Sequence, residues 1–265
     1  MRELLSIPYS PWSEKARWAL DARGVDYQKR AYQPLLGEPA LRVLLRRPFG
    51  RVSVPVLIDG KHVINESFKI ARYADELGSG PRLFPEGREA AIVDFDAASE
   101  RALAAGRALA LTRMLDDREA LEEKVPRAMR KLGPVAIAIA RAGVERTLRK
   151  YGAGEASLAD HHAMLASVLI SLRADLSRSR ASEPRTLFAT FSYADIVMSQ
   201  ALCFVQPPES AHFRIGSGSR RCYCDAELNA QFGDLVAWRD ALYARYRDAR
   251  PLPASVVSPA NGAHG

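Results

Sequence analysis

The turn Tyr9-Ser10-Pro11-Trp12-Ser13 carries residues that could activate a thiol, because it lies between an apolar run and the start of a helical pattern. Free amides and the helix dipole at such a point favour an anion, and a thiolate is one. A hydroxyl donor at Ser10 would stabilise the thiolate, which is the nucleophilic form of sulfur. The alternative interpretation is that Ser10 or Ser13 only caps the helix.

The second stretch is Val52-Ser53-Val54-Pro55-Val56, in which a proline interrupts a strand-like run. Proline is a poor residue for the interior of a sheet, and a cis peptide bond before Pro55 would resolve the conflict. The backbone of Val54 would then be free to pair with an extended peptide ligand. A proline on an edge strand is the alternative.

The third stretch is Glu66-Ser67, immediately before a helical pattern. The amides and hydroxyl at a helix start can bind a carboxylate, and the side chain of Glu66 can accept from an ammonium group. Together they suit the head group of an amino acid. The alternative is an ordinary helix cap.

Short apolar runs and helical patterns alternate over residues 1–78, which predicts a mixed sheet with crossover helices. The predicted strands span 3–7, 26–32, 54–58 and 61–64, and the last two form a hairpin across Asp59-Gly60. Predicted helices begin at Trp12 and end before Gly24, and cover 39–46 and 67–77. These elements would position all three stretches.

Gly, Ser and Pro dominate residues 78–87, which indicates a linker, and the pattern after it is helical. One apolar stripe is Leu165, Val168, Leu169, Leu172 and Leu176, and similar patterns cover 194–205 and 235–246. Ser192 and Asp195 have the spacing of a capping box. Residues 207–225 are expected to form a long loop, and those from 251 onward a frayed tail.

The bulk properties fit one or two compact domains, since the chain has 265 residues of which 48% are hydrophobic. No apolar run is long enough for a bilayer and no secretory signal is found, so the expected location is the cytoplasm. Three cysteines are too few for a disulfide framework. The net charge of +7 does not by itself distinguish nucleic acid, a membrane surface or an anionic small ligand. The histidines and cysteines lack the spacing of a zinc site, so no metal is expected.

With all three stretches in order, the sequence resembles the cytosolic glutathione S-transferases. The resemblance rests on YSPWSEKARWAL, RPFGRVSVPVLIDGKHVINES and ESFKIARYADE, and it extends to GPRLFP, FSYADIVMSQAL and WRDALYAR. It implies an α+β chain: a thioredoxin-like glutathione-binding domain over 1–78, a linker over 79–88, an all-helical domain over 89–250 and a flexible tail over 251–265.

The resemblance also implies roles for individual residues. Ser10 takes the thiol-activating position, with Tyr9 as the alternative activator, and Trp12 belongs to the glutathione site. Val54 and a cis Pro55 would pair with the cysteinyl backbone. Glu66 and Ser67 would take the γ-glutamyl end, while Ser13 would face the helix and do little. The basic contact to the glycyl carboxylate stays unassigned among four candidates, Arg42, Arg46, Arg47 and Arg51.

The function implied is a glutathione transferase-like enzyme that uses glutathione as co-substrate. It would stabilise the thiolate and direct it at an apolar electrophilic small molecule, in conjugation, reduction, isomerisation or dehalogenation. A cytoplasmic homodimer with a role in detoxification is implied, without metal, nucleic acid or membrane as partner. The alternative is a non-catalytic binding or interaction module of the same fold, supported by a proline loop that is longer than the family's and by residues 207–225.

Overall fold

The computed structural model describes residues 1–34, 36–179 and 183–249. Its sheet has four strands, β1 (Arg2–Ser6), β2 (Gln28–Ala31), β3 (Val56–Asp59) and β4 (His62–Asn65), in the order β2-β1-β3-β4. β1 is parallel to β2 and antiparallel to β3, and β3 pairs with β4 as a hairpin. Gly60 turns the hairpin with φ +57°, a conformation that glycine adopts without steric cost.

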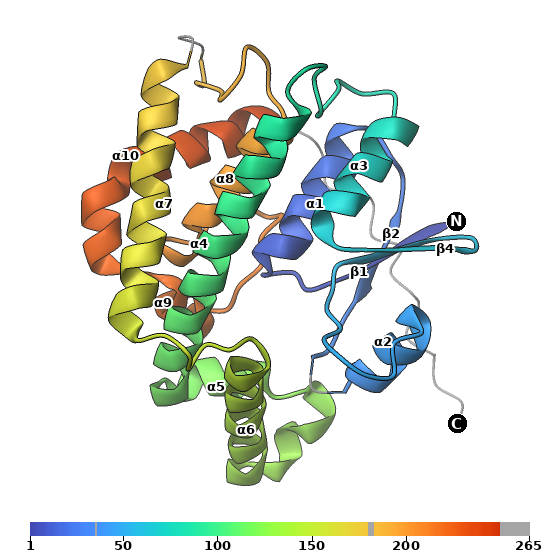
Figure 1. Ribbon diagram of the computed structural model, residues 1–265. Helices are drawn as coiled ribbons and strands as arrows, with labels where there is room; N and C mark the ends of the chain where they lie inside the picture. Colours follow the sequence, from blue (N-terminus) through green and yellow to red (C-terminus); the bar gives the residue numbers. More distant parts are fainter. Residues whose placement is uncertain (35, 180–182, 250–265) are drawn as a thin grey trace.

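Helices cover both faces of the sheet (Figure 1): α1 (Pro11–Ala22) and α3 (Ser67–Leu77) lie on one face, and α2 (Glu38–Leu45) on the other. Successive side chains of β1 point to opposite faces of the sheet, as they do in any β-strand. Leu4 packs with residues of α1 and α3, and Leu5 packs with Leu41 of α2. The predicted α+β class and thioredoxin-like N-terminal domain are confirmed.

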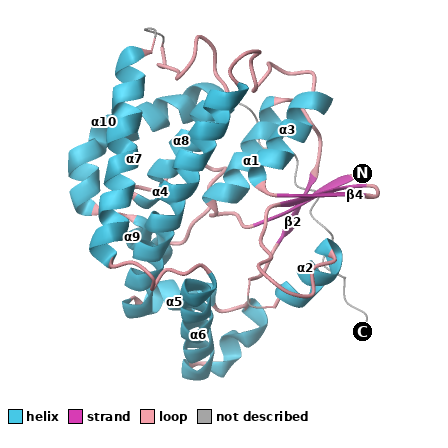
Figure 2. Ribbon diagram, viewed as in Figure 1, coloured by secondary structure: helices cyan, strands magenta, loops and turns pink. Residues whose placement is uncertain are grey.

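The rest of the described chain is helical (Figure 2). Its α-helices are α4 (Glu89–Asp116), α5 (Arg118–Lys124), α6 (Pro134–Lys150), α7 (Leu158–Arg178), α8 (Tyr193–Ala201), α9 (Ser217–Tyr223) and α10 (Ala226–Leu242). Shorter helical turns are η1 (Arg127–Leu132), η2 (Leu202–Phe204) and η3 (Tyr243–Arg247). Among the helices described, none is long and apolar enough to cross a membrane.

Helix α8 is buried along its whole length and lies against both α1 and α4. The capping box predicted from Ser192 and Asp195 is present at its start. The predicted helical pattern continued to residue 205, whereas α8 ends at Ala201 and is followed by η2. The apolar stripe predicted for α7 consists of the residues that this helix buries.

The expectation of a long loop over 207–225 is wrong, because α9 (Ser217–Tyr223) lies within it. The helix packs closely on α5: a Cβ added to Gly218 would come within 2.4 Å of the Ala120 amide nitrogen. Serine and glycine have low helix propensity, so the contact with α5 and not the local sequence stabilises this helix. The predicted tail, 251–265, lies outside the described residues. We propose 1–78, 79–88 and 89–250 as first domain, linker and second domain.

Candidate functional site

A single cleft of about 740 Å³ between the sheet domain and the helical domain collects the three stretches singled out in the sequence. Its lining includes every predicted site residue, namely Tyr9, Ser10, Trp12, Val54, Pro55, Glu66 and Ser67. On the opposite side the cleft is lined by α4, α6 and the end of α5. Residues far apart in the sequence therefore share one site.

Ser10 is the N-cap of α1 and is half-buried at the cleft. Its hydroxyl oxygen accepts from the Ser13 amide at 3.4 Å, which is a long and weak contact. Within the described residues this hydroxyl donates no hydrogen bond, so its proton remains available to a ligand. Both interpretations of Ser10 are thus compatible: it caps α1 loosely and it can donate into the cleft.

Ser13 does more than was expected of it. Its hydroxyl oxygen accepts from the Ile7 amide at 3.1 Å, and its side chain is fully buried. The contact ties the end of β1 to the first turn of α1 and fixes the path of the chain on both sides of Ser10. The sequence placed Ser13 on the helix correctly but did not indicate this bond.

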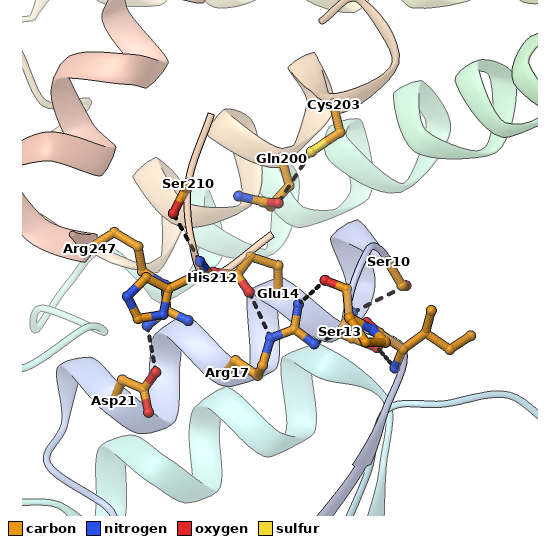
Figure 3. Close-up of polar contacts among 12 residues, drawn as sticks. Ser10, Ser13, Glu14, Arg17, Asp21, Gln200, Cys203, Ser210, His212 and Arg247 are labelled. Carbon is orange, nitrogen blue, oxygen red and sulfur yellow. Dashed lines mark hydrogen bonds and ion pairs between the residues drawn. The ribbon is translucent and has the colours of Figure 1, made fainter. Parts of the chain in front are cut away.

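Buried charged side chains also hold the turn between β1 and α1 (Figure 3). The guanidinium of Arg17 donates to the carbonyls of Ile7 and Pro8 at 3.0 and 3.1 Å. Glu14 accepts from Arg17 at 2.7 Å and from Arg247, on η3, at 2.6 Å. Burial alone would raise the pKa of Glu14, but Arg247 and Arg17 outweigh it and lower that pKa. Glu14 is therefore a buried carboxylate held ionised between two cations.

The predicted cis peptide bond between Val54 and Pro55 is present. The side-chain amide of Asn65 donates to the carbonyls of Ser53 and Pro55 at 2.9 and 3.0 Å and so holds this loop against β4. β3 begins only at Val56, so the Val54 backbone lies outside the strand ladder. The peptide groups of Val54 make no turn or loop hydrogen bond in the described chain, which leaves them to a ligand.

Glu66 and Ser67 form the start of α3, with Ser67 buried and Glu66 exposed. Glu66 has φ 81° and ψ 133°, and its side chain does not cap the helix. Such a conformation costs a non-glycine residue about 1–3 kcal/mol and is typical of ligand sites. The carboxylate of Glu66 lies 3.0 Å from the Lys69 ammonium and the first amides of α3 lack a side-chain cap, so both can meet a zwitterionic group.

The indole nitrogen of Trp12 is already committed to the protein. It donates to Glu100 of α4 at 2.7 Å, and the fully buried ammonium of Lys15 lies 2.7 Å from the other oxygen of Glu100. Lys15 also reaches Asp96 at 3.3 Å. Trp12 therefore offers its ring to the cleft and not its N–H group, and these contacts pin α1 to α4.

The cations of the cleft are not those that the sequence suggested. None of the four candidates, Arg42, Arg46, Arg47 and Arg51, lines it, and Arg42 is paired with Glu38 at 2.7 Å. The cations that do line it come from the helical domain: Arg107, Lys124, Arg146 and Lys150. Arg146 and Lys150 lie 3.1 and 3.3 Å from Glu38. No motif marks these four positions in the sequence, so no local signal could have found them.

Tyr9 lies beside Ser10 with the Lys124 ammonium 3.9 Å from its ring centroid. Its hydroxyl remains the alternative to the Ser10 hydroxyl as the group that would activate a thiol.

The described part of the chain contains no group of three His, Cys, Asp or Glu side chains placed to hold a metal. The three cysteines are free, and burial raises the pKa of Cys203 to about 12, so this thiol is a core residue and not a nucleophile.

Comparison with known proteins agrees with this geometry. Residues 4–82 match the family described as glutathione S-transferase, N-terminal domain. Glutathione S-transferase Z2 of Arabidopsis thaliana is 32% identical over 123 residues, which make up 44% of this chain and 54% of that protein. The chain spans about half the length, or less, of the curated relatives it matches.

Solved structures extend the likeness to the whole fold. The glutathione transferase GSTFuA2 of Phanerochaete chrysosporium has a TM-score of 0.62 at 22% identity, over 93% of this chain and 98% of that one. A glutathione S-transferase of Methylobacillus flagellatus, solved with glutathione bound, has a TM-score of 0.53 at 20% identity, over 95% and 100% of the two chains. At these identities the likeness establishes a shared architecture of a thioredoxin-like domain followed by a helical one.

Proposed function

We propose that this chain, whose residues 4–82 match the glutathione S-transferase family, is an enzyme that binds glutathione and directs its thiolate at an electrophilic small molecule. One observation carries the proposal. A single cleft brings together a hydroxyl at a helix start, a free stretch of peptide backbone at Val54 and a zwitterion-compatible helix start at Glu66 and Ser67. These are the groups that a tripeptide with a central thiol needs.

Each part of glutathione has a counterpart in this arrangement. The cysteinyl backbone pairs with Val54 beside Pro55, and the γ-glutamyl end meets Glu66 and Ser67. The sulfur then lies at the start of α1, where Ser10 donates to it and the helix dipole favours its negative charge. The ring of Trp12 closes the site on the side of α4.

The chemical step in a conjugation follows from a stabilised thiolate. The thiol releases its proton to solvent, and the sulfur then forms a C–S bond with the electrophile while the leaving group departs with the electron pair of its bond. The chain contributes by keeping the sulfur ionised near neutral pH and by placing the electrophile against the apolar wall of the helical domain.

The test compares wild type with Ser10→Ala. The thiolate absorbance of bound glutathione is titrated against pH, and turnover is measured with a chlorodinitrobenzene. We expect wild type to bind glutathione with a thiol pKa below that of free glutathione. Ser10→Ala should raise that pKa and lower kcat/KM by about 100-fold, as loss of one positioned donor does.

Tyr9→Phe is the matched control, because it removes the neighbouring hydroxyl and keeps the ring. If Tyr9→Phe carries the large effect and Ser10→Ala does not, the activating role belongs to Tyr9. Failure to bind glutathione at millimolar concentration would contradict the whole proposal of a glutathione-dependent enzyme. Binding without turnover of any electrophile would favour the non-catalytic module.

We also propose that the protein acts as a cytoplasmic homodimer in detoxification, with neither nucleic acid nor a membrane as partner. The support is the match of residues 4–82 to the glutathione S-transferase family. Light scattering at two protein concentrations measures the oligomeric state, and a monomeric mass at both contradicts the dimer.

A further inference from the structure

Arg107, on α4, presents a guanidinium to the cleft. Its Cζ lies 4.7 Å from the ring centroid of Trp12 and 3.7 Å from that of Tyr151. Over residues 1–34, 36–179 and 183–249 this guanidinium makes no ion pair and no hydrogen bond. Burial lowers the pKa of Arg107, so the group has lost much of its hydration. An arginine nevertheless stays charged, and its N–H groups need acceptors.

Lys124, the last residue of α5, is a second cation of the cleft for which the described residues offer no ion-pair partner. Its ammonium lies 3.9 Å from the ring centroid of Tyr9 and lines the cleft. Within the described ranges it too makes no ion pair. Its neighbour Glu123 is turned toward α9, where it accepts from the amides of Gly218 and Ser219 at 2.8 and 3.0 Å.

The carboxylates near the two cations are already occupied. Glu38 is paired with Arg146 and Lys150. Glu100 attracts Arg107 electrostatically, but its two oxygens already accept from Trp12 and Lys15. Arg146 and Lys150 are thus compensated by Glu38, whereas Arg107 and Lys124 have no carboxylate partner in the part of the chain that the structure describes. A desolvated charge such as that of Arg107 is costly until an anion pairs with it.

The remaining wall of the cleft is apolar and aromatic. It includes Leu111, Met114, Val144, Phe204 and Tyr223, all from the helical domain. An occupant of this part of the cleft therefore buries a hydrophobic body and meets a positive charge near Ser10.

We propose that Arg107 and Lys124 form an anion subsite for the electrophile, so that the preferred electrophile joins an apolar or aromatic body to a carboxylate. The inference rests on the proposed function. Arg107 lies over the ring of Trp12 and Lys124 over the ring of Tyr9, and both rings belong to the turn that contains Ser10. In glutathione the thiol belongs to the central residue and the carboxylates lie at the two ends, so an anion next to Ser10 belongs to the molecule that the sulfur attacks.

The experiment uses two probes that differ in one charge: a chlorodinitrobenzoate and the chlorodinitrobenzamide with the same substitution pattern. In both, the sulfur forms a bond to the ring carbon and chloride leaves with the electron pair. The measured quantity is the ratio of kcat/KM for the acid to kcat/KM for the amide. We expect Arg107→Gln and Lys124→Gln each to lower this ratio by at least about tenfold, and Arg107→Lys and Lys124→Arg to retain most of it.

Arg141→Gln is the matched control, because it removes the same charge from an exposed position of α6 outside the cleft. Its ratio should equal that of wild type. Circular dichroism and glutathione titration verify that each variant folds and binds the co-substrate.

Three outcomes overturn the subsite. If Arg107→Gln and Lys124→Gln slow both probes equally, the cations act on the thiolate or on the fold. If these variants weaken glutathione binding about tenfold and leave the ratio unchanged, the bound anion belongs to glutathione. If wild type binds glutathione but consumes neither probe, the proposed function fails and the subsite fails with it, whereas the first two outcomes leave the enzyme intact.

Discussion

Helices α1 and α8 both begin at a serine, and the protein completes one start while leaving the other open. At α8 the carboxylate of Asp195 accepts from the amides of Ser192 and Leu187 at 2.8 and 2.7 Å, and Ser192 and Asp195 are fully buried. At α1 the side-chain cap is one 3.4 Å contact from Ser10 to the Ser13 amide, at the edge of the cleft. The same residue type at the same helix position thus serves two purposes.

The residue three positions after the cap makes the difference. At α8 it is Asp195, whose carboxylate returns to the start of the helix and satisfies it. At α1 it is Ser13, whose hydroxyl turns away to the Ile7 amide. Amides that the protein satisfies have a structural role, and amides that it leaves exposed in a cleft are available to an anion.

An open helix start still needs support, and α1 receives it through carbonyls. Arg17 holds the carbonyls of Ile7 and Pro8, and Glu14 joins Arg17 to Arg247 near the end of the described chain. The turn is therefore held through its carbonyls, while the Ser10 hydroxyl donates no hydrogen bond within the described residues.

The largest effect on stability is expected for Glu14→Ala, because it removes the carboxylate that joins Arg17 to Arg247 next to the start of α1. Two buried guanidinium groups would lose their shared carboxylate, and the free energy of unfolding should fall by about 3–5 kcal/mol. Urea unfolding at neutral pH measures it. Glu86→Ala, at an exposed position, should stay within about 0.5 kcal/mol of wild type. A loss below about 1 kcal/mol for Glu14→Ala would contradict the claim that Glu14 stabilises the start of α1 through the two guanidinium groups.

Asp195→Ala opens the closed start and should cost about 3 kcal/mol, because two buried amides lose their acceptor. Burial raises the pKa of Asp195 to about 6, with its hydrogen bonds opposing that rise, so the carboxylate is ionised in an experiment at pH 7. Asp195→Asn keeps one acceptor oxygen and should lose less. Equal losses for both variants in urea unfolding would mean that the charge, not the acceptor, matters.

The same substitution at the two caps gives the sharpest comparison. Ser192→Ala should lower the free energy of unfolding by about 1–2 kcal/mol, whereas Ser10→Ala should lower it by less than about 0.5 kcal/mol. The reason is the long contact of Ser10 and the reciprocal bonds of Ser192. Thermal and urea unfolding of the two variants, side by side, measure the difference. Similar losses would mean that the start of α1 is as closed as that of α8.

The smallest expected effect is a pH dependence of the contribution that Glu14 makes to the free energy of unfolding. The pKa of Glu14 is lowered below its ordinary 4.5, so the unfolded chain binds the extra proton first and the stabilisation is lost as pH falls. Between pH 6 and pH 4 Glu14 should contribute a loss of up to about 0.8 kcal/mol. Asp195, with its raised pKa, contributes with the opposite sign, so the quantity to measure is wild type minus Glu14→Gln. A difference that does not change with pH would contradict the prediction.

Local signals in the sequence were sufficient for much of the fold. The hairpin at Gly60, the helix over 67–77, the buried stripe of α7 and the capping box at Ser192 were each predicted from short patterns, and each is present. The cis bond before Pro55 does not belong with these, because the local pattern also allowed a proline on an edge strand and only the resemblance implied the cis form. The predicted strands 26–32 and 54–58 are longer than β2 and β3, since propensity does not mark where pairing ends.

Helix α9 and the cations of the cleft could not be predicted in this way. Residues Ser217–Tyr223 form a helix because they pack on α5, and their own propensities oppose it. Arg107 and Lys124 are ordinary helix residues until the fold places them over Trp12 and Tyr9. Their roles depend on which charges nearby are already paired, and no local pattern contains that information.

By itself the sequence determined the two-part architecture and the three stretches that meet in the cleft, because both depend on short-range patterns of apolar residues, caps and a proline. Only the tertiary structure decided how the start of α1 is held and which cations line the cleft. Glu14 and Arg247 are separated by 233 positions in the chain, and their contact exists only once the end of the helical domain has docked on α1. Electrostatic pairing acts through space, so the folded arrangement determines which charges are neutralised and which remain to bind a ligand.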